Sequence, residues 1–330
     1  MSPSMSKRLV VLFASVLGAC SGKYVRPTTQ ERITSSPERL ARGGYLVNQA
    51  MSCGACHTTH AGDFVLTGER ADKYLAGNAF ELKDEGIKLW IPNITSDVDT
   101  GLGGWSDDEI MRALRDGVAK DGHLMFPLMP FSSYRHVSDE DLRAIVAYLR
   151  SVPPVKSPRP FQNELGFFLS FLVNRGVMHQ EPVRSVPEPD RRNQLKYGEY
   201  VMRLGHCWEC HSRTGRAPRD VGEAGFLGGW SEPDDLPGVG KVYMRNLTPD
   251  PETGLGKYTA AQLERALRDG RRLDGKRFAP PMSFFTPHLS GLSQEDMDAL
   301  VAYLRSVPPV KNAIPERALL PAFEKTLEAQ

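Results

Sequence analysis

One five-residue motif occurs twice in this chain, and it constrains the fold more than any other feature. The sequence Cys-Gly-Ala-Cys-His spans Cys53–His57, and Cys-Trp-Glu-Cys-His spans Cys207–His211 in the second half. Each motif places two thiols on one helical turn with an imidazole directly after them, a pattern typical of covalent c-type haem attachment. The repetition therefore predicts two covalently bound haem c groups. The attachment thiols are those of Cys53, Cys56, Cys207 and Cys210.

A wider duplication surrounds the two motifs. Arg112–Gly117 recurs as Arg265–Gly270, and Val146–Lys156 recurs unchanged as Val301–Lys311. A chain of 330 residues with 40% hydrophobic content is long enough to form two domains, each with its own core. The sequence thus predicts a tandem repeat of two mostly α-helical domains, at residues 36–156 and 188–311.

Capping signals indicate where the helices begin. Ser36 followed by Pro37 predicts a helix that runs into the first motif, and Pro189 is expected to open its counterpart. Capping boxes at Ser106–Glu109 and Thr259–Gln262 start a second helix in each half. Ser138 caps the last helix of the first half, whose apolar stripe is repeated in the second half. The glycine-punctuated stretch up to Thr100 predicts loops and short turns.

The internal repeat also indicates the iron ligands. His57 and His211 are expected to ligate the iron on one face, and a true opposite ligand should recur at the same place in both halves. Met129 and Met282 satisfy that test, because each lies two residues after a proline and at nearly the same interval after its histidine. A neutral thioether stabilises ferrous iron and raises the reduction potential. The methionines that fail the test are expected in the core or on the surface: Met111, Met125, Met244 and Met297.

Other ligand chemistries fit the repeat less well. A second histidine ligand would need a partner in the other half, but His123 aligns with Lys276, and His136 and His288 are one residue out of register. A zinc half-site or a redox dithiol is the other interpretation of Cys-x-x-Cys. An exported protein has little use for two pairs of reduced thiols, so haem is the favoured interpretation.

The fifth cysteine, Cys20, follows a secretory pattern. Lys7 and Arg8 precede an apolar run over 9–17 that is too short to span a bilayer. Leu17–Cys20 resembles the lipobox of bacterial lipoproteins, so we expect cleavage of a 1–19 signal peptide and acylation of Cys20. The alternative is an ordinary signal peptide with an incidental cysteine. Residues 20–35 are expected to be a flexible tether on the periplasmic side, and Ser21 favours the outer membrane.

Two further segments lie outside the predicted domains. The linker 157–187 is too apolar over 161–178 for a solvated connection. It predicts either an interdomain helix that joins the two domains or a docking surface for a partner or the membrane. Residues 312–330 are expected to be a C-terminal tail. Nucleic acid is excluded as a partner, because 41 basic residues nearly balance 40 acidic ones.

Several loop motifs carry a family resemblance. They are Asn93–Thr95, Thr100–Gly103 and Trp105 in the first half, and Asn246–Thr248, Thr253–Gly256 and Tyr258 in the second. Over residues 37–311 the sequence resembles the multihaem class I cytochromes c, in particular the cytochrome subunits of membrane-bound alcohol and gluconate dehydrogenases. The resemblance implies that Met129 and Met282 are axial ligands. It also implies close helix crossings at Gly44 and Gly198, against Tyr148 and Tyr303.

The sequence departs from that family in two places. It carries two haem motifs instead of three, and Met282-Ser283 replaces the usual Met-Pro, which suggests a looser second ligand loop. The Asn and Thr positions either hydrogen-bond around a haem edge or only fix turns. Asp97, Asp99 and Gly101 resemble a calcium loop faintly, and a turn is the favoured interpretation.

These features lead to one expected function and two alternatives. The expectation is a periplasmic electron carrier that relays single electrons between a donor, such as a dehydrogenase, and a respiratory acceptor. With six ligands on each iron it would not itself be an enzyme. The alternatives are a dihaem oxidoreductase, peroxidase-like or thiosulfate-oxidising, with one openable haem, and a structural subunit of a dehydrogenase complex.

Overall fold

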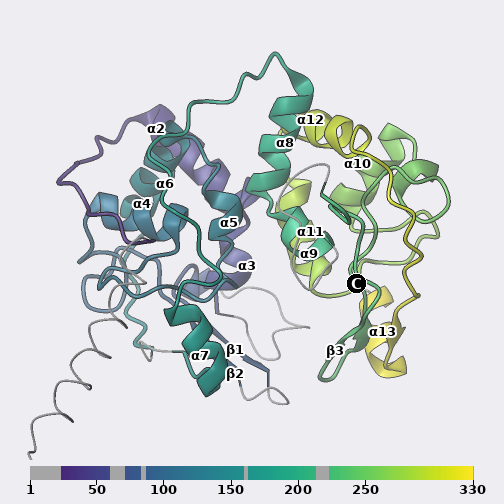
Figure 1. Cartoon of the computed structure of the whole chain (residues 1–330), viewed down its shortest axis with the longest axis horizontal. Helices are drawn as coiled ribbons and strands as arrows, with labels where there is room; N and C mark the ends of the chain where they lie inside the picture. The colour runs from purple at the N-terminus through teal and green to yellow at the C-terminus, as the bar shows by residue number, and fades with distance from the viewer. Residues whose placement is uncertain (1–23, 60–70, 83–86, 160–162, 213–222, 330) are drawn as a thin grey trace, which may run out of the picture.

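The computed structural model describes residues 24–59, 71–82, 87–159, 163–212 and 223–329, which form two mainly helical lobes side by side (Figure 1). We call residues 24–159 the first lobe and residues 188–329 the second lobe. The first lobe contains α2 (Pro37–Tyr45), the π-helix η2 (Leu46–Ala50), α3 (Cys53–His57), η3 (Ala71–Lys73), β1 (Asn78–Leu82), β2 (Ile87–Ile91), α4 (Asp107–Asp116), α5 (Phe131–Tyr134) and α6 (Asp139–Ser151). In the sequence, α7 (Phe167–Asn174) follows the first lobe and precedes the second.

The second lobe repeats the helical order of the first. It contains α8 (Gln194–Leu204), α9 (Cys207–His211), β3 (Asp234–Leu236), β4 (Gly240–Val242), η5 (Leu255–Lys257), α10 (Ala260–Asp269), α11 (Met282–Ser290), α12 (Gln294–Leu304), β5 (Ala318–Leu319) and α13 (Pro321–Ala329). The predicted mostly α tandem repeat is confirmed.

The predicted helix caps are present. Ser36 Oγ accepts a hydrogen bond from Arg39 N, and Ser138 Oγ accepts one from Asp141 N. The capping boxes at the starts of α4 and α10 are both reciprocal, with backbone and side-chain bonds in each direction. α4 ends at Gly117, which adopts the left-handed conformation with φ 66°. Short-range chemistry therefore fixes these boundaries.

In each lobe the first long helix crosses a later one closely at a glycine, α2 with α6 and α8 with α12. A Cβ on Gly43 would collide with the carbonyl oxygen of Ala144 and lie 2.8 Å from Tyr148 Cβ. A Cβ on Gly198 would collide in the same way with Ala299 and lie 2.7 Å from Tyr303 Cβ. The predicted crossings are confirmed, but the counterpart of Gly198 is Gly43. Gly44 instead lies against the edge of the Tyr148 ring.

One hydrophobic core runs through both lobes. It joins fully buried residues of η2 and α6 to those of α8 and α12, including Leu46, Ile145, Met202 and Met297. The lobes are therefore packed as one body, not tethered as two independent domains. Figure 1 shows α8 descending between the two halves.

A reciprocal pair of tyrosine–aspartate bonds crosses the interface. Tyr200 of α8 donates to Asp141 of α6 at 2.6 Å, and Tyr45 of α2 donates to Asp296 of α12 at 2.5 Å. The first long helix of each lobe thus donates a tyrosine hydrogen bond to an aspartate in the first turn of a helix of the other lobe, α12 or α6. Such an exchange of equivalent contacts is the signature of an isologous, two-fold-like interface.

We expect Tyr45→Phe and Tyr200→Phe each to lower the free energy of unfolding of the haem-loaded protein by about 1–2 kcal/mol, because each loses a charge-assisted hydrogen bond. Denaturant unfolding followed by circular dichroism measures the change. The matched control is Tyr148→Phe, whose hydroxyl accepts only a neutral bond from Asn48 within the first lobe. Losses no larger than that of the control would show that the exchanged pairs do not stabilise the interface.

Three segments differ from the predictions. The stretch expected to form loops contains the antiparallel hairpin β1–β2, in which Leu89 and Ile91 are buried while Lys88 lies over the Trp90 ring. The predicted helix from Pro189 begins at Gln194, capped by Asn193. Both long helices also stop before the haem motifs, at Ala50 and Leu204.

The C-terminal residues do not form a free tail. β5 pairs with β4, and α13 buries Phe323 and Leu327 against Val239 and Val242. Apolar residues spaced four apart on α13 give it a face to bury, and β4 supplies the matching surface. The second lobe therefore extends to residue 329.

The expected flexible tether is wrong for residues 24–35. Arg26 pairs with the buried carboxylates of Asp108 at 2.6 Å and Asp116 at 3.0 Å, and Ile33 N donates to Asp107. Buried carboxylates require partners, and this segment supplies them along α4. Cys20 and the predicted signal peptide lie outside the described residues.

The linker helix α7 packs on the first lobe. Its Val173 clusters with Val118 and Leu124, and every other member of that cluster also precedes residue 179. The prediction that this helix joins the two domains is therefore not what the structure shows. Within the described part of the chain, no helix combines the length and apolar character needed to cross a bilayer.

Candidate haem-binding sites

The two motifs adopt the same local structure. α3 and α9 are single turns that carry both cysteines and the histidine. Each follows a residue in the left-handed conformation, Ser52 with φ 53° and His206 with φ 43°. This bend separates each motif from the preceding long helix and turns its short helix in a new direction.

A backbone carbonyl orients each predicted proximal histidine. His57 Nδ1 lies 2.8 Å from the Pro92 carbonyl oxygen, and His211 Nδ1 lies 2.7 Å from that of Arg245. Burial lowers the pKa of both rings, which favours the neutral imidazole. With the Nδ1 proton donated to a carbonyl, Nε2 is the nitrogen left for a metal. Both histidine rings thus have the tautomer and the orientation that an iron ligand needs.

A cavity of about 390 Å³ in the second lobe brings the predicted site residues together. Its lining includes all four of Cys207, Cys210, His211 and Met282. Apolar side chains such as Leu263, Leu300 and Phe285 form much of the remaining wall.

The polar part of this cavity is arginine-rich. Arg277 and Arg317 both line it, and their buried Nε atoms have no hydrogen-bond partner among the described residues. An apolar wall with unsatisfied guanidinium donors suits a cofactor that has apolar faces and carboxylate groups. The residues present therefore fit a haem.

The first lobe places its site residues around α3. Cys53 and Met129 both pack against the main core. Met129 lies in a turn that leads into α5, with its N–H bonded to the Phe126 carbonyl and its own carbonyl bonded to Phe131 N.

The corresponding region of the second lobe is built differently. Met282 is the first residue of α11, which is longer than α5. Where the sequence suggested a looser loop, the structure has a helix, because Ser283 lacks the proline ring and does not exclude the methionine from the first helical position.

The other methionines divide into two groups. Met111 and Met297 are buried in the core, as predicted. Met244 instead lines the cavity of the second lobe, which the alignment of the repeats did not indicate. It adjoins Arg245, whose carbonyl holds His211, and so belongs to the same wall as that histidine. The assignment of Met129 and Met282 as iron ligands stays a prediction.

Three of the four motif cysteines are half-buried and Cys210 is exposed, yet the surrounding chain shields the thiols of Cys53 and Cys207 from water. Burial raises the pKa of Cys53 to about 12 and that of Cys207 to about 11. A redox-active dithiol requires the opposite shift, since the thiolate is the reactive species. The environment of these thiols therefore disfavours the redox-dithiol interpretation.

The two motifs meet at the interface between the lobes. Burial, followed by the nearby Glu209, Cys207, Asp234 and Cys56, raises the pKa of Cys210 to about 12. Ser52, which directly precedes the first motif, also lines the cavity of the second lobe, so the two motifs lie near each other across the interface. The candidate sites are therefore neighbours, although their sequence positions are far apart.

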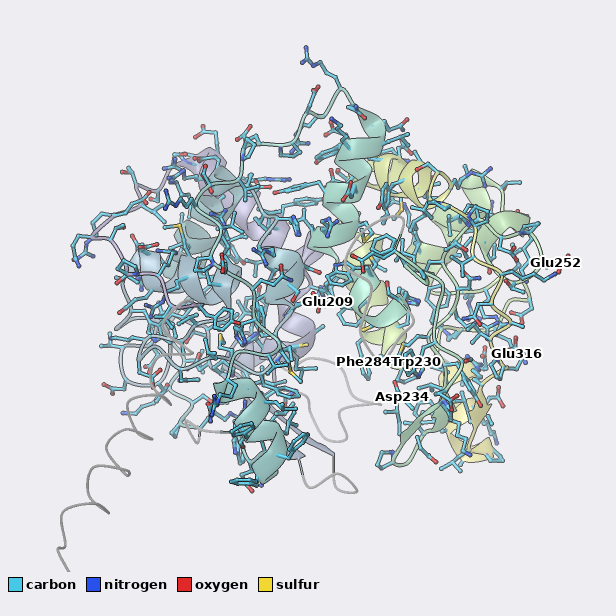
Figure 2. All side chains as sticks on the ribbon, viewed as in Figure 1. Glu209, Trp230, Asp234, Glu252, Phe284 and Glu316 are labelled. Atoms are coloured by element: carbon cyan, nitrogen blue, oxygen red, sulfur yellow. The ribbon has the colours of Figure 1, made fainter. Side chains whose placement is uncertain are left out.

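Glu209 fastens the second motif to the first lobe. Its carboxylate accepts hydrogen bonds from Ser133 N at 3.0 Å and Ser133 Oγ at 2.7 Å, and Trp208 Nε1 donates to the same Oγ at 2.6 Å. Figure 2 shows Glu209 between the lobes. Burial raises its pKa to about 7. Ser133 belongs to α5, the helix that follows Met129.

Aromatic rings continue this contact between the sites. His206 makes edge contacts with Tyr134 of the first lobe at 6.1 Å and with Phe285 of the second at 5.4 Å between ring centroids. Sequence reasoning missed Tyr134, His206 and Glu209. The one available signal was that Glu209 replaces Ala55 of the first motif.

The Asn and Thr motifs fix turns. Asn93 Oδ1 accepts bonds from Thr95, and its Nδ2 donates to the Val155 carbonyl, while Asn246 makes the same bonds to Thr248 and Val310. Asp97 Oδ1 accepts two bonds from Thr100 at 2.6 Å, so its carboxylate closes a turn as predicted.

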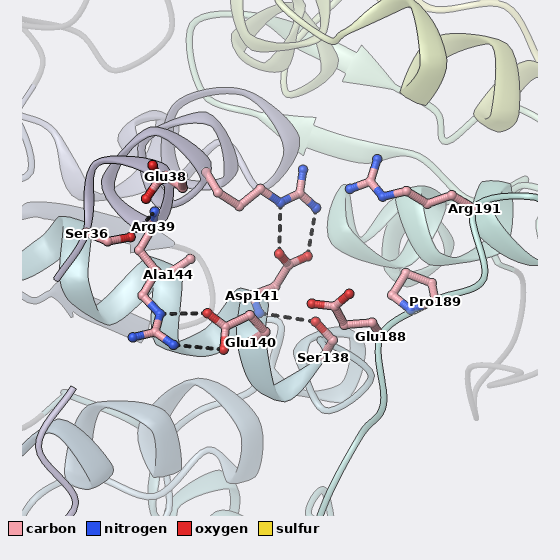
Figure 3. A pocket seen from close by; sticks show the side chains of 11 residues that line it. Ser36, Glu38, Arg39, Ser138, Glu140, Asp141, Ala144, Glu188, Pro189 and Arg191 are labelled. Atoms are coloured by element: carbon pink, nitrogen blue, oxygen red, sulfur yellow. Dashed lines mark hydrogen bonds and ion pairs between the residues drawn. The ribbon is translucent and has the colours of Figure 1, made fainter. Parts of the chain in front are cut away.

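A second cavity, of about 440 Å³, lies between α2, α6 and the start of the second lobe at Glu188–Arg191, and no cysteine lines it (Figure 3). Four of its charged side chains form two ion pairs: Arg39 with Glu140 at 2.6 Å and Arg42 with Asp141 at 2.7 Å. Arg191, also in the lining, pairs with Glu295 at 2.7 Å. We assign no cofactor to this cavity.

Comparison with known sequences agrees with this geometry. The cytochrome c family matches residues 40–153 and 195–308, one copy in each lobe. The chain belongs to the cytochrome c family. Two cytochrome c domains in tandem, each with its Cys-x-x-Cys-His motif, imply covalent haem c in both lobes of this cytochrome.

Curated relatives include cytochromes of dehydrogenases. The cytochrome is 28% identical over 300 residues to the fructose dehydrogenase cytochrome subunit of Gluconobacter japonicus, covering 87% of this chain and 57% of the relative. It is 31% identical over 279 residues to the gluconate 2-dehydrogenase cytochrome c subunit of Pantoea cypripedii, covering 81% and 59%. The chain thus spans less than two thirds of the length of either subunit.

A third relative matches over its full length. The cytochrome is 28% identical over 318 residues to a diheme cytochrome c-type protein of Cereibacter sphaeroides, covering 93% of this chain and 100% of the relative. These relatives support electron transfer as the role of the chain. The predicted resemblance to cytochrome subunits of dehydrogenases is confirmed.

Proposed function

We propose that this cytochrome is a lipid-anchored dihaem electron carrier on the periplasmic side of a bacterial membrane, with the outer membrane favoured by Ser21. It relays single electrons from a dehydrogenase, or another donor, to a respiratory acceptor. The observation that carries the proposal is the pair of Cys-x-x-Cys-His turns, each with a buried histidine whose Nδ1 is bonded to a carbonyl. A bound haem supplies the one-electron redox chemistry.

The residues of the chain have three roles in this proposal. The thiols of Cys53, Cys56, Cys207 and Cys210 hold the cofactors covalently. Nε2 of His57 and His211 and the thioethers of Met129 and Met282 would be the protein ligands of the two irons. Apolar side chains such as Leu263, Leu300 and Phe285 would surround the second haem.

The dehydrogenase donor is supported by the relatives, several of which are cytochrome subunits of dehydrogenases. The match over the full length of a diheme cytochrome supports a unit with two haems. Purification from the native membrane tests the partner: we expect a dehydrogenase subunit to co-purify, or a purified dehydrogenase to reduce the cytochrome directly.

Spectroscopy distinguishes a carrier from a dihaem oxidoreductase. Because both irons are expected to be six-coordinate, with a histidine and a methionine ligand in addition to the four porphyrin nitrogens, the oxidised protein should give only low-spin ferric signals in paramagnetic resonance. The reduced protein should bind carbon monoxide slowly or not at all. A high-spin ferric signal together with rapid carbon monoxide binding would favour the alternative, an enzyme with one openable haem.

The lipid anchor is tested by mass spectrometry of the mature N-terminus. We expect a chain that begins at Cys20 and carries acyl groups, and that floats with vesicles in a density gradient. More than one acyl chain would hold the protein stably, since a single chain binds only marginally. A Cys20→Ala variant should lose both the acyl groups and flotation. A mature chain without acyl groups would refute the anchor.

A further inference from the structure

The outer face of α7 is an apolar surface of unusual composition. Phe167 is 90% exposed, Phe168 70% and Phe171 44%. The segment from Gly166 to Asn174 contains no charged side chain. Exposed phenylalanines scattered singly need no explanation, but three on one short uncharged helix indicate a contact surface.

The opposite face of the same helix holds it in place. Leu165, Leu169 and Val173 pack into the cluster that contains Val118 and Leu124 of the first lobe. In addition, the linker pairs with β2 through two backbone bonds of 2.9 Å between Lys88 and Glu164. The phenylalanines are therefore presented on a fixed support. A helix that is apolar on both faces is typical of one that is buried on both sides.

The position of residues 24 and 25 indicates what covers the outer face of α7. Tyr24 and Val25 pack in the same cluster as α7, and the Tyr24 ring lies against Gly176 just beyond the helix. Cys20 precedes Tyr24 by four residues, which span at most about 14 Å when extended. An acyl group on Cys20 therefore brings the bilayer surface close to α7.

We propose that the outer face of α7 lies in the membrane interface, with Phe167, Phe168 and Phe171 inserted among the lipids. This inference rests on the acylation of Cys20 proposed above. A helix of eight residues is too short to span a bilayer, and its apolar face suits the boundary between headgroups and acyl chains. Arg175, whose guanidinium lies 4.9 Å from the Phe171 ring centroid, can extend to the headgroups.

This second contact gives the anchor an orientation. Lipid chains at the end of a flexible segment would leave the lobes free to rotate, whereas a helix in the interface fixes the first lobe. The α7 cluster includes Leu124 and Phe126, which belong to the loop that carries Met129. The membrane would thus lie on the side of the first lobe where this loop runs.

Cysteine protection on vesicles tests the proposal. The acylated, haem-loaded protein carries either Phe168→Cys or the control Leu195→Cys and is added to preformed phosphatidylethanolamine–phosphatidylglycerol vesicles. Leu195 is 48% exposed at the start of α8, at the opposite end of the molecule from α7 in Figure 1. Floated vesicles are treated with a charged maleimide. Each rate is divided by that of the same variant unfolded in urea.

We expect the normalised rate for Phe168→Cys to be at least about tenfold lower than that for Leu195→Cys, because a charged reagent does not enter the acyl region. Equal normalised labelling rates for the two variants on floated protein would overturn the proposal. The outer face of α7 would then be a candidate contact surface for a protein partner. Flotation is measured separately from labelling. Protein that does not float would refute the lipid anchor and, with it, this inference.

Discussion

Replacing Met282 with leucine is expected to remove about half of the methionine-to-iron absorption band while both haems stay covalently attached. Leucine fills a similar apolar volume but has no sulfur to bind iron. Met129→Leu should remove the other half, and the double variant should lose the band completely. The reduction potential of each altered centre should fall by on the order of 0.1 V, within the roughly 0.8 V that axial ligands span.

Met244→Leu is the matched control for this series. Met244 lines the same cavity as Met282 but adjoins the residue that holds His211. We expect its replacement to leave both the band and the potentials unchanged. A full band in both the Met129→Leu and Met282→Leu variants would refute the ligand assignment. Loss of half the band in the Met244→Leu variant alone would show that Met244, and not Met282, is the methionine ligand of the second iron.

The features predicted correctly depend on neighbouring residues or on comparison of the two repeats. A capping box such as Ser106 with Glu109 involves two side chains three positions apart, so the sequence contains the whole interaction. The haem motifs are equally local. The assignment of Met129 and Met282 as ligands stays a prediction, and it needed the second copy because a lone methionine carries no positional signal.

The features that were missed depend on contacts between distant segments. Residues 24–35 look like a polar tether, and nothing near Arg26 indicates that Asp108 and Asp116 will bind it. The same is true of Glu209, whose partner Ser133 lies in the other lobe. A polar residue in such a segment is predicted to be exposed to solvent, because the residues near it in the sequence do not identify its partner.

The orientation of the two histidines also could not be predicted from the sequence, for a different reason. His57 is held by the carbonyl of a proline and His211 by that of an arginine. Every residue supplies a carbonyl, so the identity of the side chain carries no information about this role. Only the path of the backbone, after Ile91 in one lobe and after Met244 in the other, places the acceptor.

Substitution of Gly43 or Gly198 by alanine is expected to lower the free energy of unfolding by about 3 kcal/mol or more. The new methyl group would collide with a backbone carbonyl of the crossing helix, Ala144 or Ala299, and neither helix can yield without opening the shared core. Alanine favours the helix itself by up to about 1 kcal/mol, which offsets only part of the loss. Guanidinium unfolding of the haem-loaded protein measures the change.

Two other glycines serve as graded controls for this steric argument. A Cβ on Gly44 would lie 3.0 Å from the flexible Tyr148 ring, so the gain in helix propensity should nearly cancel the crowding in Gly44→Ala. Gly166 has open space around it and a negative φ, so Gly166→Ala should change the stability by only a few tenths of a kcal/mol. If Gly43→Ala proves as stable as Gly44→Ala, the helices of the first lobe do not cross at Gly43, and the apparent equivalence of Gly43 and Gly198 fails with it.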